Sequence, residues 1–301
     1  RTPGDIFLLP NFGHPYMYCP SQHRTQTQVR RCPPTVSRAL SAYQLSMSEE
    51  LKAKCLAAGV KRMVFVRHAQ AAPPAGKKPD FKGIHDWQAS DQMRPLTEQG
   101  KKQAKAAREG WFSKDVGRTN NKCLVTSGAR RAAETLQVFG EEVIAKKGFF
   151  AKLGLGCGSS ESVAFAVSSE LVGGLHPAGI APACEALFDT HGYAPLAKFY
   201  GMEGGKEAYA EYGEIVCKEL AALVEKVKHN QGNTITVFGH AVFLNAIAMQ
   251  LLLACGGDAA QVLKATEVDL GEGEGFSVDI GAGATSASVT HYTLRPHPLW
   301  P

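Results

Sequence analysis

The chain has 301 residues, 44% of them hydrophobic, and a formal net charge of +5 at pH 7. Residues 1–48 hold five arginines and one acidic residue, so the rest of the chain is nearly neutral and its charge does not argue for a nucleic-acid partner. No apolar run reaches the roughly 20 residues that a membrane-spanning helix needs. The eight scattered cysteines form no C-x-x-C pair and no cluster with zinc spacing, which favours reduced thiols and argues against a metal centre.

The first 46 residues differ in composition from the rest. They are rich in Arg, Ser, Thr, Gln and Pro, almost free of acidic residues, and show no sustained hydrophobic period. Two interpretations stay open: a segment of an organelle transit peptide, or upstream sequence outside a working protein that starts at Met47. The first predicts a mitochondrial or plastid protein, and the second a cytoplasmic one. We expect residues 1–46 to be disordered and residues 47–301 to form the folded domain.

From residue 49 onward, helical and strand patterns alternate. Helices are expected over residues 49–58, 97–111, 129–147, 209–227 and 241–255. Strands are expected over residues 62–66, 122–126, 234–238, 268–280 and 286–294. Residues 71–90 are predicted to be a loop, and residues 151–205 an irregular region with short helices. Strands separated by helices predict an α/β fold, a three-layer sandwich with a mostly parallel central sheet and helices on both faces.

Three of the predicted strands end next to an Arg or a His. Arg67 and His68 follow the first strand, Arg131 follows the second by five residues, and His240 follows the third. In open α/β sheets, ligands bind at the carboxyl ends of the strands. We therefore expect these four side chains to meet in one pocket, although they are far apart in the chain.

This set of side chains is suited to binding a phosphate group and attacking it with an imidazole. A neutral imidazole attacks phosphorus near pH 7 and forms a phosphohistidine, which water later cleaves. The transferred phosphoryl group carries charge on three oxygens, so fixed cations stabilise it. The planar fork of an arginine binds two of those oxygens at once. A second imidazole can donate a further hydrogen bond to them.

Four segments carry a resemblance to a known family. Residues 64–70, V-F-V-R-H-A-Q, resemble the Arg-His-Gly signature of the histidine phosphatase superfamily, also called the phosphoglycerate mutase-like fold. Residues 94–100 resemble the R-P-L-T-x-x-G element of its small phosphohistidine phosphatase (SixA-like) branch. Residues 127–135 match its S-x-x-x-R-A-x-x-T helix start, and Gly239 with His240 matches its second-histidine motif. The four elements occur in the family's order, and the similarity covers roughly residues 62–295.

The resemblance implies a role for each matched residue. His68 is the phosphorylated nucleophile, Arg67 and Arg131 bind the phosphate, and His240 is the second histidine of the pocket. Arg131 is preferred over its neighbour Arg130, because the family's arginine directly precedes an alanine and lies four residues after the serine. Arg94 is a further candidate for phosphate binding at the pocket entrance, with a surface arginine beside a helix as the alternative.

The chain departs from the family at several positions. Ala69 replaces the glycine of the signature, a small change. Residues 70–74, Q-A-A-P-P, lack the polar groups found there in the family's mutases, which argues against a sugar-phosphate mutase. An alkoxide leaving group needs a general acid. The resemblance implies a carboxylate between the helix that carries Arg131 and the second histidine, and Glu170 is the candidate best placed by sequence order. A phosphoramidate or acyl phosphate leaves readily without one.

Several other features have simpler interpretations. His85, His176 and His191 are expected to be solvated surface histidines. Asp91 either helps to hold the segment around Arg94 or is solvated. The glycine-rich runs at residues 154–158 and 271–275 lack the context of a nucleotide-binding loop and are predicted to be flexible turns.

The sequence as a whole predicts a metal-independent phosphatase that needs no cofactor. Its substrate is expected to be a phosphorylated small molecule or a phosphoprotein. Two alternatives stay open: a phosphoglycerate mutase-type phosphotransferase that needs a bisphosphate primer, and a non-catalytic scaffold or subunit of a larger assembly with the same fold. The sequence makes no prediction of the oligomeric state.

Overall fold

The computed structural model describes residues 47–76, 84–117, 120–140, 172–177, 180–280 and 288–294. Residues 1–46, the predicted leader, and Glu170, the predicted proton donor, lie outside these ranges. None of the helices within the described ranges has the length and apolar character that crossing a bilayer requires. The five cysteines in the same ranges form no disulfide, and four of them are buried.

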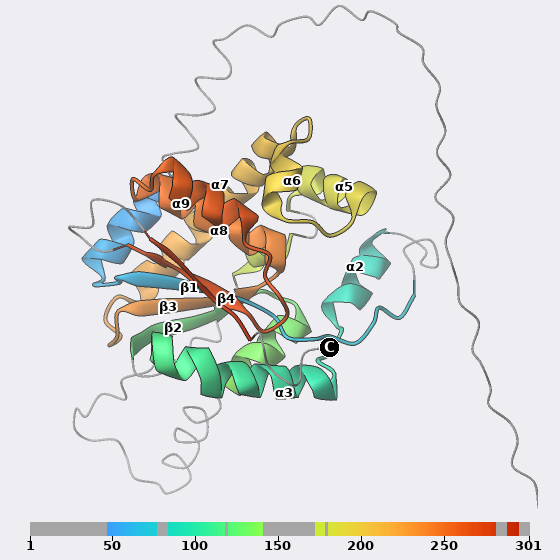
Figure 1. The fold of residues 1–301 in the computed structure, drawn as a ribbon, viewed down its shortest axis with the longest axis horizontal. Coiled ribbons are helices and arrows are strands. Elements are labelled where there is room, and N and C mark those ends of the chain that lie inside the picture. Colours follow the sequence, from blue (N-terminus) through green and yellow to red (C-terminus); the bar gives the residue numbers. More distant parts are fainter. Residues whose placement is uncertain are drawn as a thin grey trace, which may run out of the picture.

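A five-stranded sheet lies at the centre of the molecule (Figure 1). In chain order its strands are β1 (Arg62–Arg67), β2 (Asn121–Thr126), β3 (Thr234–Gly239), β4 (Gly275–Asp279) and β5 (Val289–Tyr292). Across the sheet they are ordered β2-β3-β1-β4-β5. Strands β2, β3 and β1 are parallel, whereas β4 pairs antiparallel with both β1 and β5. The predicted α/β class is confirmed, with a mixed sheet whose parallel part holds the three strands singled out from the sequence.

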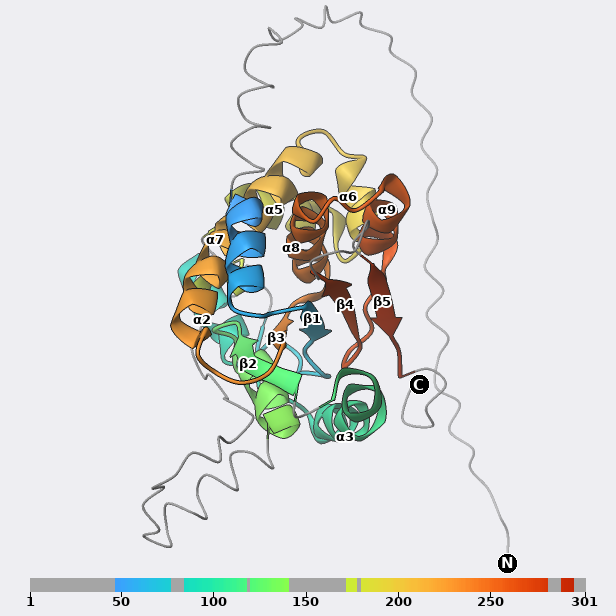
Figure 2. The same ribbon diagram turned by 90° about the vertical axis from the view of Figure 1, so that its left-hand side faces the viewer.

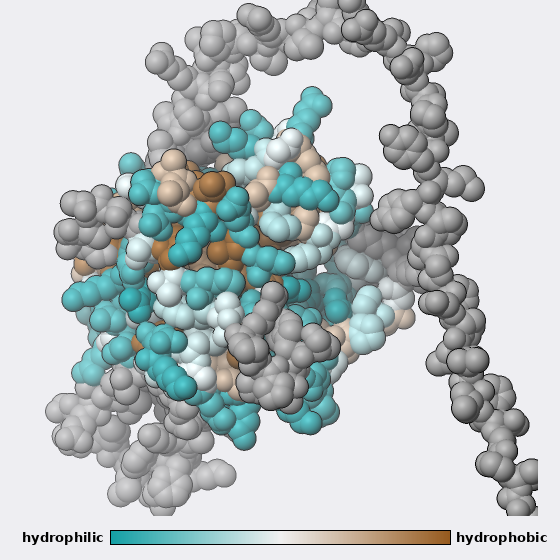
Figure 3. Space-filling view, in the orientation of Figure 1, coloured by the Kyte–Doolittle hydropathy of each residue, from teal (hydrophilic) through white to brown (hydrophobic). Residues whose placement is uncertain are grey.

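Both faces of the sheet are buried, as β1 shows. Met63 and Phe65 pack in one core cluster, and Val64 and Val66 pack in another, because successive side chains of a strand point to opposite faces. Helices α7 (Gly205–Val227) and α8 (Ala241–Ala254) cover the first face, and α3 (Glu98–Ala107) with the helix over 130–140 covers the second (Figure 2). On the side drawn in Figure 3 the described surface is mainly hydrophilic.

The five predicted helices are present with slightly different ends, and the last part of the one predicted over 129–147 lies outside the described residues. The helical segments within the described ranges that have not yet been named are the helix over 47–57, α2 (Ile84–Gln92), a π-helical stretch Arg108–Val116, a short 3₁₀ helix Gly173–Leu175, α5 (Pro182–His191), α6 (Leu196–Tyr200) and α9 (Ala259–Glu267). The prediction of a loop over 71–90 is wrong at its end, where α2 begins. The prediction of a strand over 268–280 is wrong in its first half, because β4 covers only Gly275–Asp279.

The segment 94–100 holds the chain that follows His68. The backbone N–H of Thr97 donates to the carbonyl of Gln70 at 3.0 Å, and the N–H of Gln70 donates to Oε1 of Gln103 at 3.0 Å. Thr97 also caps α3 by accepting from the N–H of Gly100 at 2.9 Å. A Cβ atom at Gly100 would lie 2.1 Å from the Gln70 carbonyl oxygen, so this close approach requires glycine.

The carboxyl ends of the three parallel strands are level with one another. Arg67 of β1 pairs with Gly239 of β3, and Thr126 of β2 pairs with Phe238 of β3. The residues that follow these strands therefore emerge together at one edge of the sheet, where α/β proteins bind their ligands.

Candidate active site

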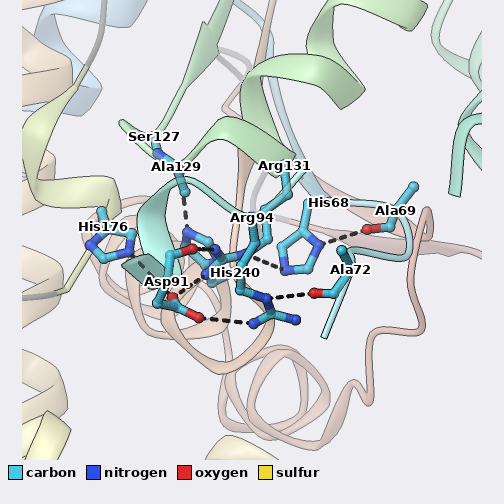
Figure 4. A network of polar contacts seen from close by, with 10 residues as sticks. All are labelled: His68, Ala69, Ala72, Asp91, Arg94, Ser127, Ala129, Arg131, His176 and His240. Atoms are coloured by element: carbon cyan, nitrogen blue, oxygen red, sulfur yellow. Dashed lines mark hydrogen bonds and ion pairs between the residues drawn. The ribbon is translucent and has the colours of Figure 1, made fainter. Parts of the chain in front are cut away.

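His68 leaves β1 with its imidazole ring fixed by the backbone. Its Nδ1 lies 2.8 Å from the carbonyl oxygen of Ala69, which can only accept, so the proton of a neutral ring is on Nδ1. Nε2 then carries the lone pair, and it accepts a hydrogen bond from Nε of Arg131 at 3.3 Å (Figure 4). The nitrogen that would attack a phosphorus atom is thus the one beside an arginine.

Arg131 lies in the first turn of the helix over 130–140 and is held from several sides. Its Nη1 donates to the backbone carbonyl of Asp91 at 2.6 Å, and its Nη2 donates to Oδ2 of the same residue at 2.9 Å. The Arg131 side chain is only 7% exposed, whereas the neighbouring Arg130 side chain is 49% exposed and pairs with Glu134. Of the two adjacent arginines, the structure turns Arg131 toward His68 and Arg130 toward solvent.

His240 precedes α8 and faces His68 across the pocket. The two ring centroids are 5.2 Å apart in an edge-to-face arrangement. Nε2 of His240 lies 3.2 Å from Oγ of Ser127, and Nδ1 lies 3.5 Å from Nη2 of Arg131. Since the arginine can only donate, Nδ1 of a neutral His240 accepts and Nε2 carries the proton.

Two further arginines border the same space. Nη1 of Arg67 donates to the carbonyl of Leu270 at 2.5 Å, and its guanidinium lies 5.1 Å from the centroid of the Tyr193 ring. Arg94 donates from Nε to the carbonyl of Ala72 at 2.6 Å and from Nη1 to Oδ1 of Asp91 at 2.9 Å. Both line the pocket, so the structure places Arg94 at the site rather than on the open surface.

Asp91 connects Arg94 and Arg131. The sequence had left open whether Asp91 holds the segment around Arg94 or is solvated. Its carboxylate bonds to Arg131 through Oδ2 and to Arg94 through Oδ1 (Figure 4). Burial favours the neutral acid, but the two arginines outweigh it and hold the pKa of Asp91 below its usual value. Asp91 is therefore a carboxylate at neutral pH, and α2 carries it over the edge of the sheet.

The prediction that His176 is a solvated surface residue is wrong. Its side chain is 7% exposed, its ring centroid lies 5.3 Å from that of His240, and its Nε2 is 4.0 Å from Oδ2 of Asp91. A histidine in a region predicted to be irregular carries no sequence signal of such burial. His191 is exposed at the end of α5, as expected. The side chain of His85, Glu170 and residues 154–158 lie outside what the structure describes.

The three clustered imidazoles are held neutral. Burial, followed by the charge of Arg131, lowers the pKa of His68 to about 3 and that of His176 to about 4. The same two causes lower the pKa of His240 well below its usual value. A neutral imidazole keeps its lone pair, and a lone pair is what a nucleophile needs.

We expect acid to destabilise the fold through these histidines. Between pH 6.5 and the lowered values, the unfolded chain binds protons that the folded chain rejects. Above pH 6.5 the rings are neutral in both states and cost no stability, and as the pH falls from 6.5 toward the lowered pKa values of about 4 and 3 they increasingly favour the unfolded chain. Each proton of difference contributes a slope of up to about 1.4 kcal/mol per pH unit to the free energy of unfolding.

Urea unfolding at pH 7, 6 and 5 measures this slope. The free energy of unfolding of the wild type should fall with falling pH. The slope for His176→Gln should be smaller, by up to the contribution of one proton. His229→Gln, at an exposed turn after α7, is the matched control and should keep the wild-type slope. A wild-type slope in His176→Gln would contradict the assignment of a buried, neutral imidazole at that position.

The side chains described above line a cavity of about 370 Å³. Besides the arginines and the histidines, its lining includes Trp87 and Gln88 from α2 and Glu185, Phe188 and Asp189 from α5. Within the described ranges no group of three or more His, Cys, Asp or Glu side chains is placed to hold a metal ion. The cavity combines cations and neutral imidazoles, which is suited to an oxyanion.

No protein-family model and no curated protein matches the chain. Solved structures do match, including a mycobacterial glucosyl-3-phosphoglycerate phosphatase (15% identity, TM-score 0.46, covering 77% of this chain and 97% of that chain). A protein histidine phosphatase SixA in complex with tungstate matches at 15% identity and a TM-score of 0.38, over 77% of this chain and 96% of that chain. A candidate SixA phosphohistidine phosphatase from Agrobacterium tumefaciens matches at 14% identity and a TM-score of 0.35, over 73% and 92%.

The likeness to histidine phosphatase structures thus extends over most of the chain. At these identities and TM-scores the likeness assigns neither a family nor an activity nor a residue role to this protein. Any function must be argued from the site itself.

Proposed function

We propose that this protein is a metal-independent phosphatase that hydrolyses a phosphomonoester or a phosphohistidine through a covalent phosphohistidine on His68. The observation that carries the proposal is the meeting of His68, His240 and Arg131 within hydrogen-bonding or ring-contact distance, from three different strand ends. Structural histidines at strand ends seldom share one cavity with three arginines, and a phosphoryl group uses both kinds of side chain.

Substrate binding is proposed to exchange one hydrogen bond for another. In the structure Nε of Arg131 donates to Nε2 of His68. An incoming phosphate oxygen takes over that donor, and the lone pair of Nε2 is released to face the phosphorus. Arg67 binds the phosphate from the β1 side, and Arg94 binds it at the entrance. Asp91 keeps Arg131 oriented during the exchange, because its backbone carbonyl and its carboxylate accept from Nη1 and Nη2 of Arg131.

The reaction then proceeds in two displacements. Nε2 of His68 forms a bond to phosphorus while the bond from phosphorus to the leaving group breaks, and the leaving group takes the electron pair. The phosphorylated ring keeps its Nδ1 proton on the Ala69 carbonyl, which stabilises the cationic ring. A water molecule next attacks the phosphorus, the N–P bond breaks, and the imidazole is restored with release of phosphate. Nδ1 of His240 accepts from Nη2 of Arg131 and thereby helps to orient that arginine toward the phosphoryl oxygens in both steps.

An assay of the purified 301-residue chain tests this proposal. We expect hydrolysis of p-nitrophenyl phosphate and of a phosphohistidine peptide, unchanged by an excess of EDTA, since imidazole and arginine supply the chemistry. Monophosphoglycerate with 2,3-bisphosphoglycerate should give phosphate and no isomer. Activity lost on chelation would contradict the metal-free mechanism, isomer formation would favour the mutase alternative, and no hydrolysis of either phosphate would favour a scaffold.

A further inference from the structure

Four carboxyl groups line the cavity, and they differ in what they can do. Those of Asp91 and Glu185 are engaged: Asp91 with two arginines, and Glu185 as the acceptor of a 3.2 Å hydrogen bond from Gln88. Asp189 lies on the exposed side of α5, at the outer rim. Glu272 is the fourth. Its carboxyl group makes no hydrogen bond with any residue in the described ranges, and it is half-buried.

The turn that carries Glu272 is fixed to the residue before the nucleophile. The N–H of Arg67 donates to the carbonyl of Glu274 at 3.0 Å, and the N–H of Gly273 donates to the carbonyl of Arg67 at 3.3 Å. Gly273 has a φ of 77°, which glycine adopts without strain. These bonds hold the turn at the end of β1, one residue from His68.

The buried side chain of Glu274 stiffens the same turn from inside. It is 1% exposed, and its Oε2 accepts from the N–H of Gly271 at 2.8 Å. The expectation that residues 271–275 form a flexible glycine-rich turn is therefore corrected: Gly271, Gly273 and Glu274 are bonded to each other or to β1, and Gly275 pairs with β1 as the first residue of β4. A fixed turn can position a side chain for catalysis, which a flexible one cannot.

The surroundings of Glu272 favour its protonated form, whereas those of Asp91 favour the charged carboxylate. Burial raises the pKa of Glu272, against the opposing charges of Arg67 and Arg94. Asp91 has its pKa lowered by the arginines that it bonds to. When two carboxyl groups of one pocket are driven apart in this way, the one with the raised pKa is suited to give a proton and the other to stay charged.

We propose that Glu272 is the general acid that protonates the leaving oxygen when the substrate is the phosphate ester of an alcohol. The inference rests on the proposed function. As Nε2 of His68 bonds to phosphorus and the P–O bond breaks, the electron pair passes to the oxygen, which takes the proton of the Glu272 carboxyl. In the second displacement the Glu272 carboxylate accepts a proton from the attacking water, so the acid is restored with the free imidazole.

The choice of leaving group tests this role. An alkoxide is too basic to leave unprotonated, whereas p-nitrophenolate leaves without help. We expect Glu272→Gln to lower kcat/KM for an alkyl phosphate such as glycerol phosphate by roughly 10²–10⁴-fold. The same variant should keep kcat/KM for p-nitrophenyl phosphate within about threefold of the wild type, because kcat/KM reports formation of the phosphohistidine and this leaving group departs without an acid. Glu272→Asp, which keeps a carboxyl group, should recover part of the alkyl phosphatase activity.

Two further variants serve as comparisons. Glu267→Gln changes an exposed glutamate at the end of α9 and should leave both substrates unaffected. Glu170→Gln changes the residue that the sequence favoured. The pH profile gives a second readout: the decline of alkyl phosphate hydrolysis on the alkaline side should be present in the wild type and absent in Glu272→Gln.

Each outcome decides the matter. A selective loss in Glu272→Gln supports the inference. An unchanged kcat/KM on both substrates, an equal loss of kcat/KM on both, or a selective loss that appears in Glu170→Gln instead overturns it while leaving the proposed phosphatase intact. A wild-type chain that hydrolyses neither substrate overturns the proposed function itself, and the inference with it.

Discussion

Replacing His68 with alanine is expected to abolish phosphatase turnover, with a fall in kcat of roughly 10³-fold or more. The imidazole is the group that bonds to phosphorus in the proposed mechanism, and no other ring in the described part of the chain has a nitrogen both neutral and within hydrogen-bonding distance of Arg131 Nε. His240 cannot substitute, because its Nδ1 faces the terminal nitrogen of the same arginine and its Nε2 faces Ser127.

The His68→Ala variant needs a control that separates chemistry from folding. His229→Ala removes an exposed histidine from the turn after α7 and should retain wild-type turnover. Urea unfolding of both variants checks that the fold survives. Wild-type turnover in a folded His68→Ala protein would show that the nucleophile has been assigned wrongly.

The second large effect is expected at Arg131, with its neighbour as the matched control. Arg131→Ala should lower kcat/KM by roughly 10²–10³-fold, since it removes a buried cation aimed at the phosphoryl oxygens. Arg130→Ala should stay within about twofold, because Arg130 is exposed and makes a surface ion pair of little energetic weight. The two substitutions delete the same side chain one residue apart, so both variants lose one positive charge and they differ in the site from which it is lost.

Charge and geometry at Arg131 can also be separated. Arg131→Ala leaves the buried Asp91 carboxylate with one arginine partner instead of two, which itself costs stability. Arg131→Lys keeps the positive charge and loses the fork that binds two oxygens, so we expect an intermediate loss of activity. Equal kcat/KM values for Arg130→Ala and Arg131→Ala would contradict a phosphate-binding role for Arg131.

The parallel core was predictable because its strands are buried on both faces. A strand such as β1 has no polar face, so it appears in the sequence as a short unbroken apolar run, and the three runs located β1, β2 and β3. Their parallel pairing then brought the residues after each strand to one edge. The convergence of His68, Arg131 and His240 follows from that pairing rather than from any local signal.

The parts that were missed depend on contacts between distant residues. Helix α2 has a weak apolar stripe and is preceded by prolines and glycines, and Asp91 at its end meets Arg131, 40 residues away in the chain. His176 is buried because His240 and Asp91 surround it, and a lone histidine in a loop gives no sign of that. The antiparallel direction of β4 and β5 likewise follows from their pairing, which no local pattern encodes.

Mass spectrometry of the enzyme, quenched in alkali during turnover and digested, tests the central claim most directly, because a phosphoryl group on nitrogen survives alkali. The account predicts one additional phosphoryl group on the peptide that contains His68, at the imidazole, in the wild type and none in His68→Ala. A phosphoryl group on His176, His240 or an oxygen side chain, or turnover that proceeds with no labelled peptide, would contradict it.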